Sequence, residues 1–118
     1  MHSQTSIGDK LSDAFSQMVK GDKFYANGEY SKAIPCYKKV TKSKNLTDRE
    51  AAYVKLATTY KKVNEYESAE DAYRKYMEIN PEPAKEVVFD YAQILKANGK
   101  YEEATEQYTN YVKNNPND

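Results

Sequence analysis

The stretch LATTYKKVNEYESAEDAYRKYMEINP (Leu56–Pro81) is followed by a second of the same design, YAQILKANGKYEEATEQYTNYVKNNP (Tyr91–Pro116). Apolar residues recur at i, i+3 and i+4 in both, which is the period of an amphipathic helix. In the first stretch they are Tyr66, Ala69, Ala72, Tyr73 and Tyr76. Each stretch has a break in its middle and ends in proline, which a helix interior does not accommodate. Each therefore predicts a helical hairpin.

A third copy of the pattern, GDKFYANGEYSKAIPCYKKV (Gly21–Val40), precedes these two. The small residue in the middle of each second helix, Ala33, Ala69 and Ala104, recurs after 36 and then 35 residues. Residues that tolerate positive φ lie before it at the break: Gly28, Asn64 and Gly99. Tyrosines predicted to pack back over each helix pair follow the break: Tyr30, Tyr66 and Tyr101. Small residues that allow the two helices to approach closely lie in each first helix: Gly21, Ala57 and Ala92. An array of hairpins follows from this period.

The predicted helices span residues 9–27, 30–43, 48–63, 66–79, 84–97 and 101–113, after a disordered tail at 1–8. The run Thr47-Asp48-Arg49-Glu50 predicts a capping box at the start of the third helix. No stretch has the alternation of a strand, so the fold class is all-α.

With these three copies the sequence resembles the tetratricopeptide (TPR) repeat family over about residues 14–118, with repeats at about 14–47, 50–83 and 85–118. The expected domain spans residues 9–118. The resemblance implies a right-handed superhelical solenoid whose concave side is lined by the first helix of each pair. The first copy departs from the family pattern. Gln17 and Lys20 occupy positions that are usually apolar, Asn45 replaces a proline, and Pro35 falls inside a helix.

The resemblance also places the binding surface of such a domain on the concave side and implies a protein or peptide partner. The expected site residues are Met18, Asp22, Tyr25, Val54, Thr58, Lys61, Lys62, Phe89, Gln93 and Lys96. They form an apolar set (Met18, Val54, Phe89) beside polar and partly cationic sets, which suits an extended peptide or a partner helix. The alternative is that the apolar set only packs helix against helix. Family members that grip a terminal carboxylate use Lys and Asn at fixed places in the first two copies and Lys and Arg in the third. In this chain those places hold Met18, Asp22, Lys55, Glu86 and Asp90, and acids where cations are needed argue against that activity.

The residue inventory argues against an enzyme, a cofactor and a metal site. The single histidine is His2, and Cys36 has no base positioned to activate it, so it is expected to be a packing thiol. The acid pairs Glu67–Glu70 and Glu102–Glu103 are predicted on helix exteriors. Lysines and arginines number 18, as do the acids, giving a net charge of zero, which argues against a nucleic-acid partner. The lysines at 32, 38, 39, 42 and 44 leave an acidic or phosphate-bearing surface as an alternative.

No apolar run is long enough for a membrane span, so no direct insertion is expected. The sequence stops shortly after Pro116, where a cap helix or a fourth repeat is expected. We therefore expect a weak self-association surface at Tyr108, Tyr111 and Val112. The alternative function that follows from such a surface is a structural spacer. The run from Glu50 to Tyr111 is similar to the N-terminal TPR segment of OmpA-family envelope proteins of Bacteroidetes, including a component of type IX secretion and gliding. That resemblance implies a periplasmic location after removal of a signal peptide, with the cytoplasm as the alternative.

Overall fold

The computed structural model describes residues 7–117, with side chains described for residues 13–117. Six helices follow one another: α1 (Ile7–Ala26), α2 (Tyr30–Val40), α3 (Leu46–Lys62), α4 (Tyr66–Ile79), α5 (Lys85–Ala97) and α6 (Tyr101–Asn114). No strand occurs in this part of the chain, so the predicted all-α class is confirmed.

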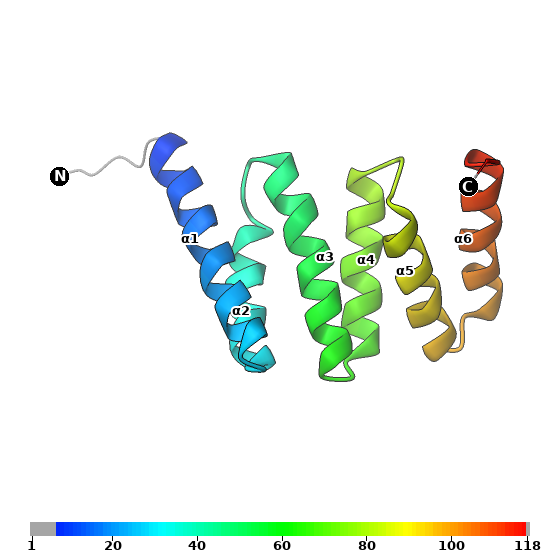
Figure 1. The fold of residues 1–118 in the computed structure, drawn as a ribbon, viewed down its shortest axis with the longest axis horizontal. Coiled ribbons are helices and arrows are strands. Elements are labelled where there is room, and N and C mark those ends of the chain that lie inside the picture. Colours follow the sequence, from blue (N-terminus) through cyan, green and yellow to red (C-terminus); the bar gives the residue numbers. More distant parts are fainter. Residues whose placement is uncertain (1–6, 118) are drawn as a thin grey trace.

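The helices pair into three antiparallel hairpins, α1–α2, α3–α4 and α5–α6, which lie side by side in a row (Figure 1). The row measures 54 × 29 × 20 Å. Its radius of gyration is 15.8 Å, whereas a compact domain of this length would have a value of about 13.5 Å. Each hairpin therefore packs mainly on its neighbours in the row, as expected for a solenoid.

Each hairpin turns on one residue with positive φ, as the sequence predicts. These residues are Gly28 (77°), Asn64 (63°) and Gly99 (80°). The backbone N–H of the residue after each donates back into the preceding helix, from Glu29 to the Phe24 carbonyl at 2.8 Å in the first hairpin. This left-handed closure satisfies carbonyls at the helix end and reverses the chain.

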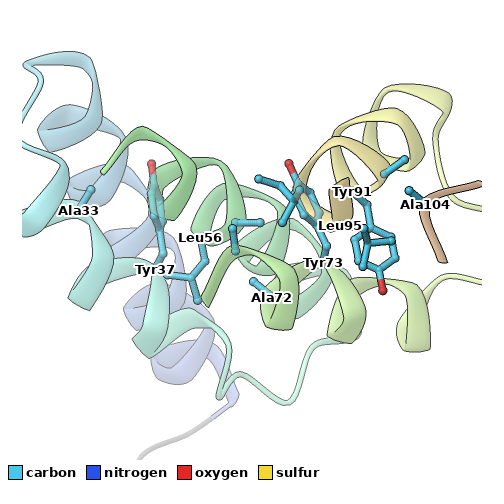
Figure 2. Close-up of a cluster of buried hydrophobic side chains, with 12 residues drawn as sticks. Ala33, Tyr37, Leu56, Ala72, Tyr73, Tyr91, Leu95 and Ala104 are labelled. Carbon is cyan, nitrogen blue, oxygen red and sulfur yellow. The ribbon is translucent and has the colours of Figure 1, made fainter. Parts of the chain in front are cut away.

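A single apolar cluster runs through all three hairpins (Figure 2). The alanines in the middle of the second helices, Ala33, Ala69 and Ala104, are fully buried. Tyr37 and Tyr73 belong to the same cluster. A second, smaller cluster of Ala14, Val40 and Ala52 joins the start of the row. The helix α1, which departs most from the family pattern, is thus packed through Ala14 and through Met18, which contacts both clusters.

The joint between the second and third hairpins is polar. Glu70 on α4 is only 6% exposed, and it accepts hydrogen bonds from Lys100 at 2.6 Å, from Asn98 at 2.8 Å and from Arg74. Burial acts to raise the pKa of Glu70, but the hydrogen bonds from Lys100, Asn98 and Arg74 outweigh it and hold the pKa below its usual value. The prediction that Glu70 lies on a helix exterior is therefore wrong, because two of its three partners, Asn98 and Lys100, lie 28 and 30 positions further along the chain.

Several predicted boundaries are also wrong. The helix α3 starts two residues earlier than predicted because Asn45, not Thr47, caps it: the Asn45 side chain accepts from the Asp48 N–H at 2.9 Å. The helix α2 ends at Val40 instead of residue 43, with Thr41 as its C-cap. Residues 7 and 8, predicted to be disordered, belong to α1, and the rest of the predicted tail lies outside the described residues.

Candidate functional site

A three-helix polar cluster lies where α1, α2 and α3 meet. The Asp22 carboxylate accepts a hydrogen bond from the Tyr37 hydroxyl at 2.6 Å. Its two oxygens also accept from Lys55 Nζ at 2.8 and 2.7 Å. Lys55 Nζ lies 6.0 Å from the centre of the Tyr37 ring, within reach of a cation–π contact. The cluster links the first two hairpins through side chains 33 residues apart.

Burial and hydrogen bonding within the cluster shift the pKa values of Asp22 and Tyr37. Burial acts to raise the pKa of Asp22, but the hydrogen bonds from Lys55 and Tyr37 and the charge of Lys55 hold it below its usual value. Burial, reinforced by Asp22, raises the pKa of Tyr37 well above that of an ordinary tyrosine. Lys55 therefore faces an ionised carboxylate within the chain itself. This pairing adds a structural reason why Lys55 would be a poor grip for an incoming carboxylate.

The second copy repeats the arrangement with different chemistry. Thr58 stands in the place of Asp22, and its hydroxyl donates to the Val54 carbonyl at 2.9 Å. Burial, together with the charge of Asp90, raises the pKa of Tyr73 to about 12. The hydroxyls of Tyr37 and Tyr73 point to one side of the core, whereas that of Tyr91 points to the other (Figure 2).

The third copy presents aromatic rings in place of a polar cluster. Phe89 on α5 makes edge-to-face contacts with Tyr108 and Tyr111 of α6, at centroid distances of 5.3 and 6.0 Å. Lys85 Nζ lies 5.8 Å from the centre of the Phe89 ring. Phe89 remains exposed despite these contacts.

The predicted site residues divide into two groups. Asp22, Lys62, Phe89, Gln93 and Lys96 are exposed, whereas Met18, Tyr25, Val54, Thr58 and Lys61 are half-buried. Met18 contacts both core clusters, and Tyr25 packs on the core and, edge to face at 5.2 Å, on Tyr30. Of the predicted apolar set, Met18 therefore packs helix against helix.

Two apolar residues of α1 are exposed beside Asp22. The family pattern also places Phe15 on the inward side of the first helix, whereas it does not predict Val19. Phe15 is 72% exposed and Val19 is 37% exposed. They precede Asp22 by seven and three residues, so the three share one face of the helix. The spacing from Asp22 was visible in the sequence, but the exposure of both side chains depends on the packing of the neighbouring hairpin.

Two hollows lie beside the second helices of the hairpins. One, of about 640 Å³, lies between α2 and α4 and has Tyr53, Leu56 and Tyr60 of α3 among its lining residues. The other, of about 650 Å³, lies between α4 and α6 and has Met77, Val88 and several side-chain amides in its wall. Both hollows are wide open to solvent, so they are gaps between neighbouring second helices more than enclosed ligand sites.

The remaining candidates for chemistry have structural positions. Cys36 is buried and its thiol donates to the Lys32 carbonyl at 3.6 Å, as expected of a packing thiol. His2 lies outside the described residues. Among residues 13–117, whose side chains the structure describes, there is no group of three or more potential metal ligands. Lys32 pairs with Glu29 at 3.0 Å, and Lys38, Lys39, Lys42 and Lys44 are exposed.

None of the described helices has both the length and the apolar character needed to cross a membrane.

Comparison with known families assigns the class of protein. The sequence profile of the family described as "Tetratricopeptide repeat" matches residues 50–83 and 86–118, which together exceed half of the chain. The chain belongs to the tetratricopeptide repeat family. Comparison with curated proteins finds no match.

Solved structures of similar fold include three TPR domains. The second TPR of Spaghetti (RPAP3), bound to the HSP90 peptide SRMEEVD, has a TM-score of 0.74 and 20% identity, covering 87% of this chain and 94% of that one. The first TPR of Spaghetti, bound to the same peptide, has a TM-score of 0.73 and 22% identity, covering 91% and 85%. The TPR domain of Arabidopsis FLU has a TM-score of 0.76 and 21% identity, covering 92% and 99%.

Proposed function

We propose that this chain is a non-catalytic docking module that holds a peptide or a helix of a partner protein against its first helices, α1, α3 and α5. The observation that carries the proposal is the exposed strip on α1. Phe15 and Val19 are solvent-exposed on the same helix face as Asp22, whose carboxylate and Lys55 partner form a fixed polar rim. An apolar patch beside positioned hydrogen-bonding groups is the usual composition of a peptide site.

The charge distribution indicates the polarity of the partner. The last turn of α3 carries Lys61 and Lys62, and the last turn of α5 carries Lys96. These lysines stand at helix C-termini, where a cation also complements the helix dipole. A partner with an apolar anchor for Phe15 and Val19 and an acidic group towards these lysines would match the surface. The TPR domains of Spaghetti that share the fold were solved with a peptide bound, which supports a peptide partner here.

The test is selection of binding peptides from a displayed library of short random sequences. Selected peptides should lose affinity for Phe15→Glu, because the added charge would have to be desolvated at the anchor position. Lys39→Glu is the matched control, since Lys39 is exposed on α2 and contributes to none of the contacts described above. Both variants should keep the helical circular dichroism spectrum. Peptides that bind Phe15→Glu and the parent chain equally would overturn the proposal.

A structural spacer that self-associates through α6 is the second candidate function. It is favoured by Val112, which is 62% exposed on the last helix next to Tyr108. Light scattering over a range of protein concentrations distinguishes it, because a spacer of this kind would form dimers or longer arrays.

The cellular context that we propose is a periplasmic secretion assembly of the envelope. It rests on the resemblance of residues 50–111 to the TPR segment of OmpA-family envelope proteins. Fractionation of cells that produce the native protein tests it: recovery from the cytoplasm would exclude the proposed compartment.

A further inference from the structure

The outer side of α6 carries an uncharged surface that we call the α6 end face. It consists of Tyr101, Thr105, Tyr108 and Val112, which share one side of the helix at i, i+4, i+7 and i+11. Tyr101 is 65% and Val112 62% exposed. Thr105 is exposed as well, and Tyr108 is half-buried because its ring packs on Phe89. The prediction that Tyr101 packs over its own helix pair is therefore wrong, and Tyr101 joins Tyr108 and Val112 at this end of the row.

The equivalent positions of the two earlier hairpins are covered. On α4 they are Tyr66, Glu70, Tyr73 and Met77, all of them buried or half-buried. On α2 they are Tyr30, Ile34, Tyr37 and Thr41, which are buried or half-buried too. In both cases the next element along the row is the first helix of the following hairpin, α5 over α4 and α3 over α2 (Figure 1). The chain thus shows twice which kind of element covers this surface.

The two covering helices share a sequence pattern. Three large apolar residues recur at i, i+3 and i+7 on each, with an alanine directly after the second: Tyr53, Leu56 and Tyr60 on α3, and Val88, Tyr91 and Leu95 on α5. All six are buried or half-buried. The ring of Tyr91 lies 5.9 Å from that of Tyr73 on α4. The pattern therefore describes a helix that fits the outer side of a preceding hairpin.

We propose that the α6 end face binds an amphipathic helix of a partner protein, with large apolar residues at i, i+3 and i+7. This surface is separate from the strip on α1, so it goes beyond the docking function proposed above. A helix suits it because the cover of α2 and α4 is helical, and an uncharged partner face suits it because the four residues carry no charge.

A second copy of this chain stacked head to tail fits the surface poorly. The helix that would stack on α6 in a head-to-tail array is α1, and its residues at the three pattern positions are Gln17, Lys20 and Phe24. Two of the three are polar, and Lys20 would bring an ammonium group against Tyr108 and Val112 with no acid among the four residues of the face. Burying an unpaired charge is unfavourable. The sequence of α1 therefore favours a partner protein over a second copy.

The test uses the peptide KEVVFDYAQILKA, the sequence of α5, as the probe helix. The labelled peptide is titrated with the whole chain by fluorescence anisotropy, and its site is mapped by NMR shifts. We expect binding with shifts at Tyr101, Thr105 and Val112, and a loss of affinity of at least about tenfold for Val112→Glu, since a charge would enter an apolar contact. Lys113→Glu, an exposed neighbour on the same helix, should leave the affinity unchanged.

A peptide that carries Tyr91→Ser and Leu95→Ser is the matched probe control and should not bind. Four results would overturn the proposal: no binding of the α5 peptide, equal binding of the control peptide, shifts confined to α4 (which would mean that the peptide replaces α5), or a dimer of the chain that Val112→Glu converts to a monomer. The last result would make a second copy the occupant. None of these results depends on the strip on α1, so failure here is distinguishable from failure of the proposed function.

Discussion

Replacing Gly21 by alanine tests the closeness of α1 to α2, on which the position of Asp22 depends. A Cβ atom at residue 21 would lie 2.7 Å from Cε1, 2.9 Å from Cδ1 and 3.1 Å from Cζ of Tyr37. The ring cannot move aside freely. Tyr37 is fully buried and its hydroxyl is hydrogen-bonded to Asp22 at 2.6 Å. The added methyl group must therefore shift one helix relative to the other.

Two effects of opposite sign determine the magnitude. Alanine is preferred to glycine inside a helix by about 1 kcal/mol. Overpacking a close-packed core costs roughly 1–3 kcal/mol, and the upper half of that range applies where ring atoms lie below 3 Å. The net expectation for Gly21→Ala is a loss of about 1–2 kcal/mol in the free energy of unfolding. For a domain of this size that lowers Tm by about 4 °C per kcal/mol.

The assay is urea unfolding of a double-mutant cycle with Tyr37→Leu. Once the ring is removed, Gly21→Ala should stabilise the chain by about 1 kcal/mol, because only the helix preference remains. The coupling energy between the two positions is then about 2–3 kcal/mol, at the upper end of what contacting residues show. If Gly21→Ala stabilises the parent and the Tyr37→Leu variant equally, the close approach of α1 to Tyr37 is refuted.

Three further outcomes are expected. Gly99→Ala should cost about 1 kcal/mol in urea unfolding, because φ is +80° there and no atom lies near the added Cβ, so the loss is backbone strain alone. Glu70→Gln should flatten the acid side of the plot of unfolding free energy against pH. The lowered pKa of Glu70 stabilises the fold above the usual carboxyl range, and this stability is lost as the pH falls through the lowered pKa. An unchanged acid side would contradict the role of the buried carboxylate. In a spectrophotometric titration, Tyr73→Phe should remove a phenol that ionises only near pH 12, whereas an unchanged late phase would place Tyr73 outside the core.

The features that the sequence predicts correctly are encoded within one hairpin. In each copy a glycine or asparagine lies two residues before a tyrosine and five residues before a buried alanine. This pattern is enough to locate each turn, because few residue types accept positive φ. The burial of Ala69, Tyr73 and Tyr76 follows in the same way from helical period alone. Each of these local rules can be tested in all three copies, so the repeat strengthens the prediction.

The features that the sequence does not predict depend on contacts between hairpins. The ionised Asp22 is paired with Lys55, and the buried Glu70 with Lys100, across about one repeat length each. In the sequence Glu70 stands among other acids of α4, where a solvated position is the ordinary expectation. Asn45 illustrates a different cause. The family pattern has a proline at this position, whereas in the structure the Asn45 side chain caps α3. A residue that departs from the family pattern can thus form a stabilising contact of its own.

The two joints of the row differ in where their charges lie, and the difference bears on docking. Between the first two hairpins the ion pair of Asp22 and Lys55 borders the strip on α1. Ile34 and Val63 stand at the positions that Glu70 and Asn98 hold in the other joint, and they line a hollow together with the charged residues Lys38 and Glu65.

Between the second and third hairpins the charges gather on Glu70, and the charge of Glu70 helps to raise the pKa of Tyr91. A partner seated beside Phe15 would therefore change the hydration of the charges that join the first two hairpins. An exposed pair such as Asp22–Lys55 stabilises by only about 0–1 kcal/mol in water, and excluding water strengthens it. Docking on α1 should accordingly stiffen the first joint of the row.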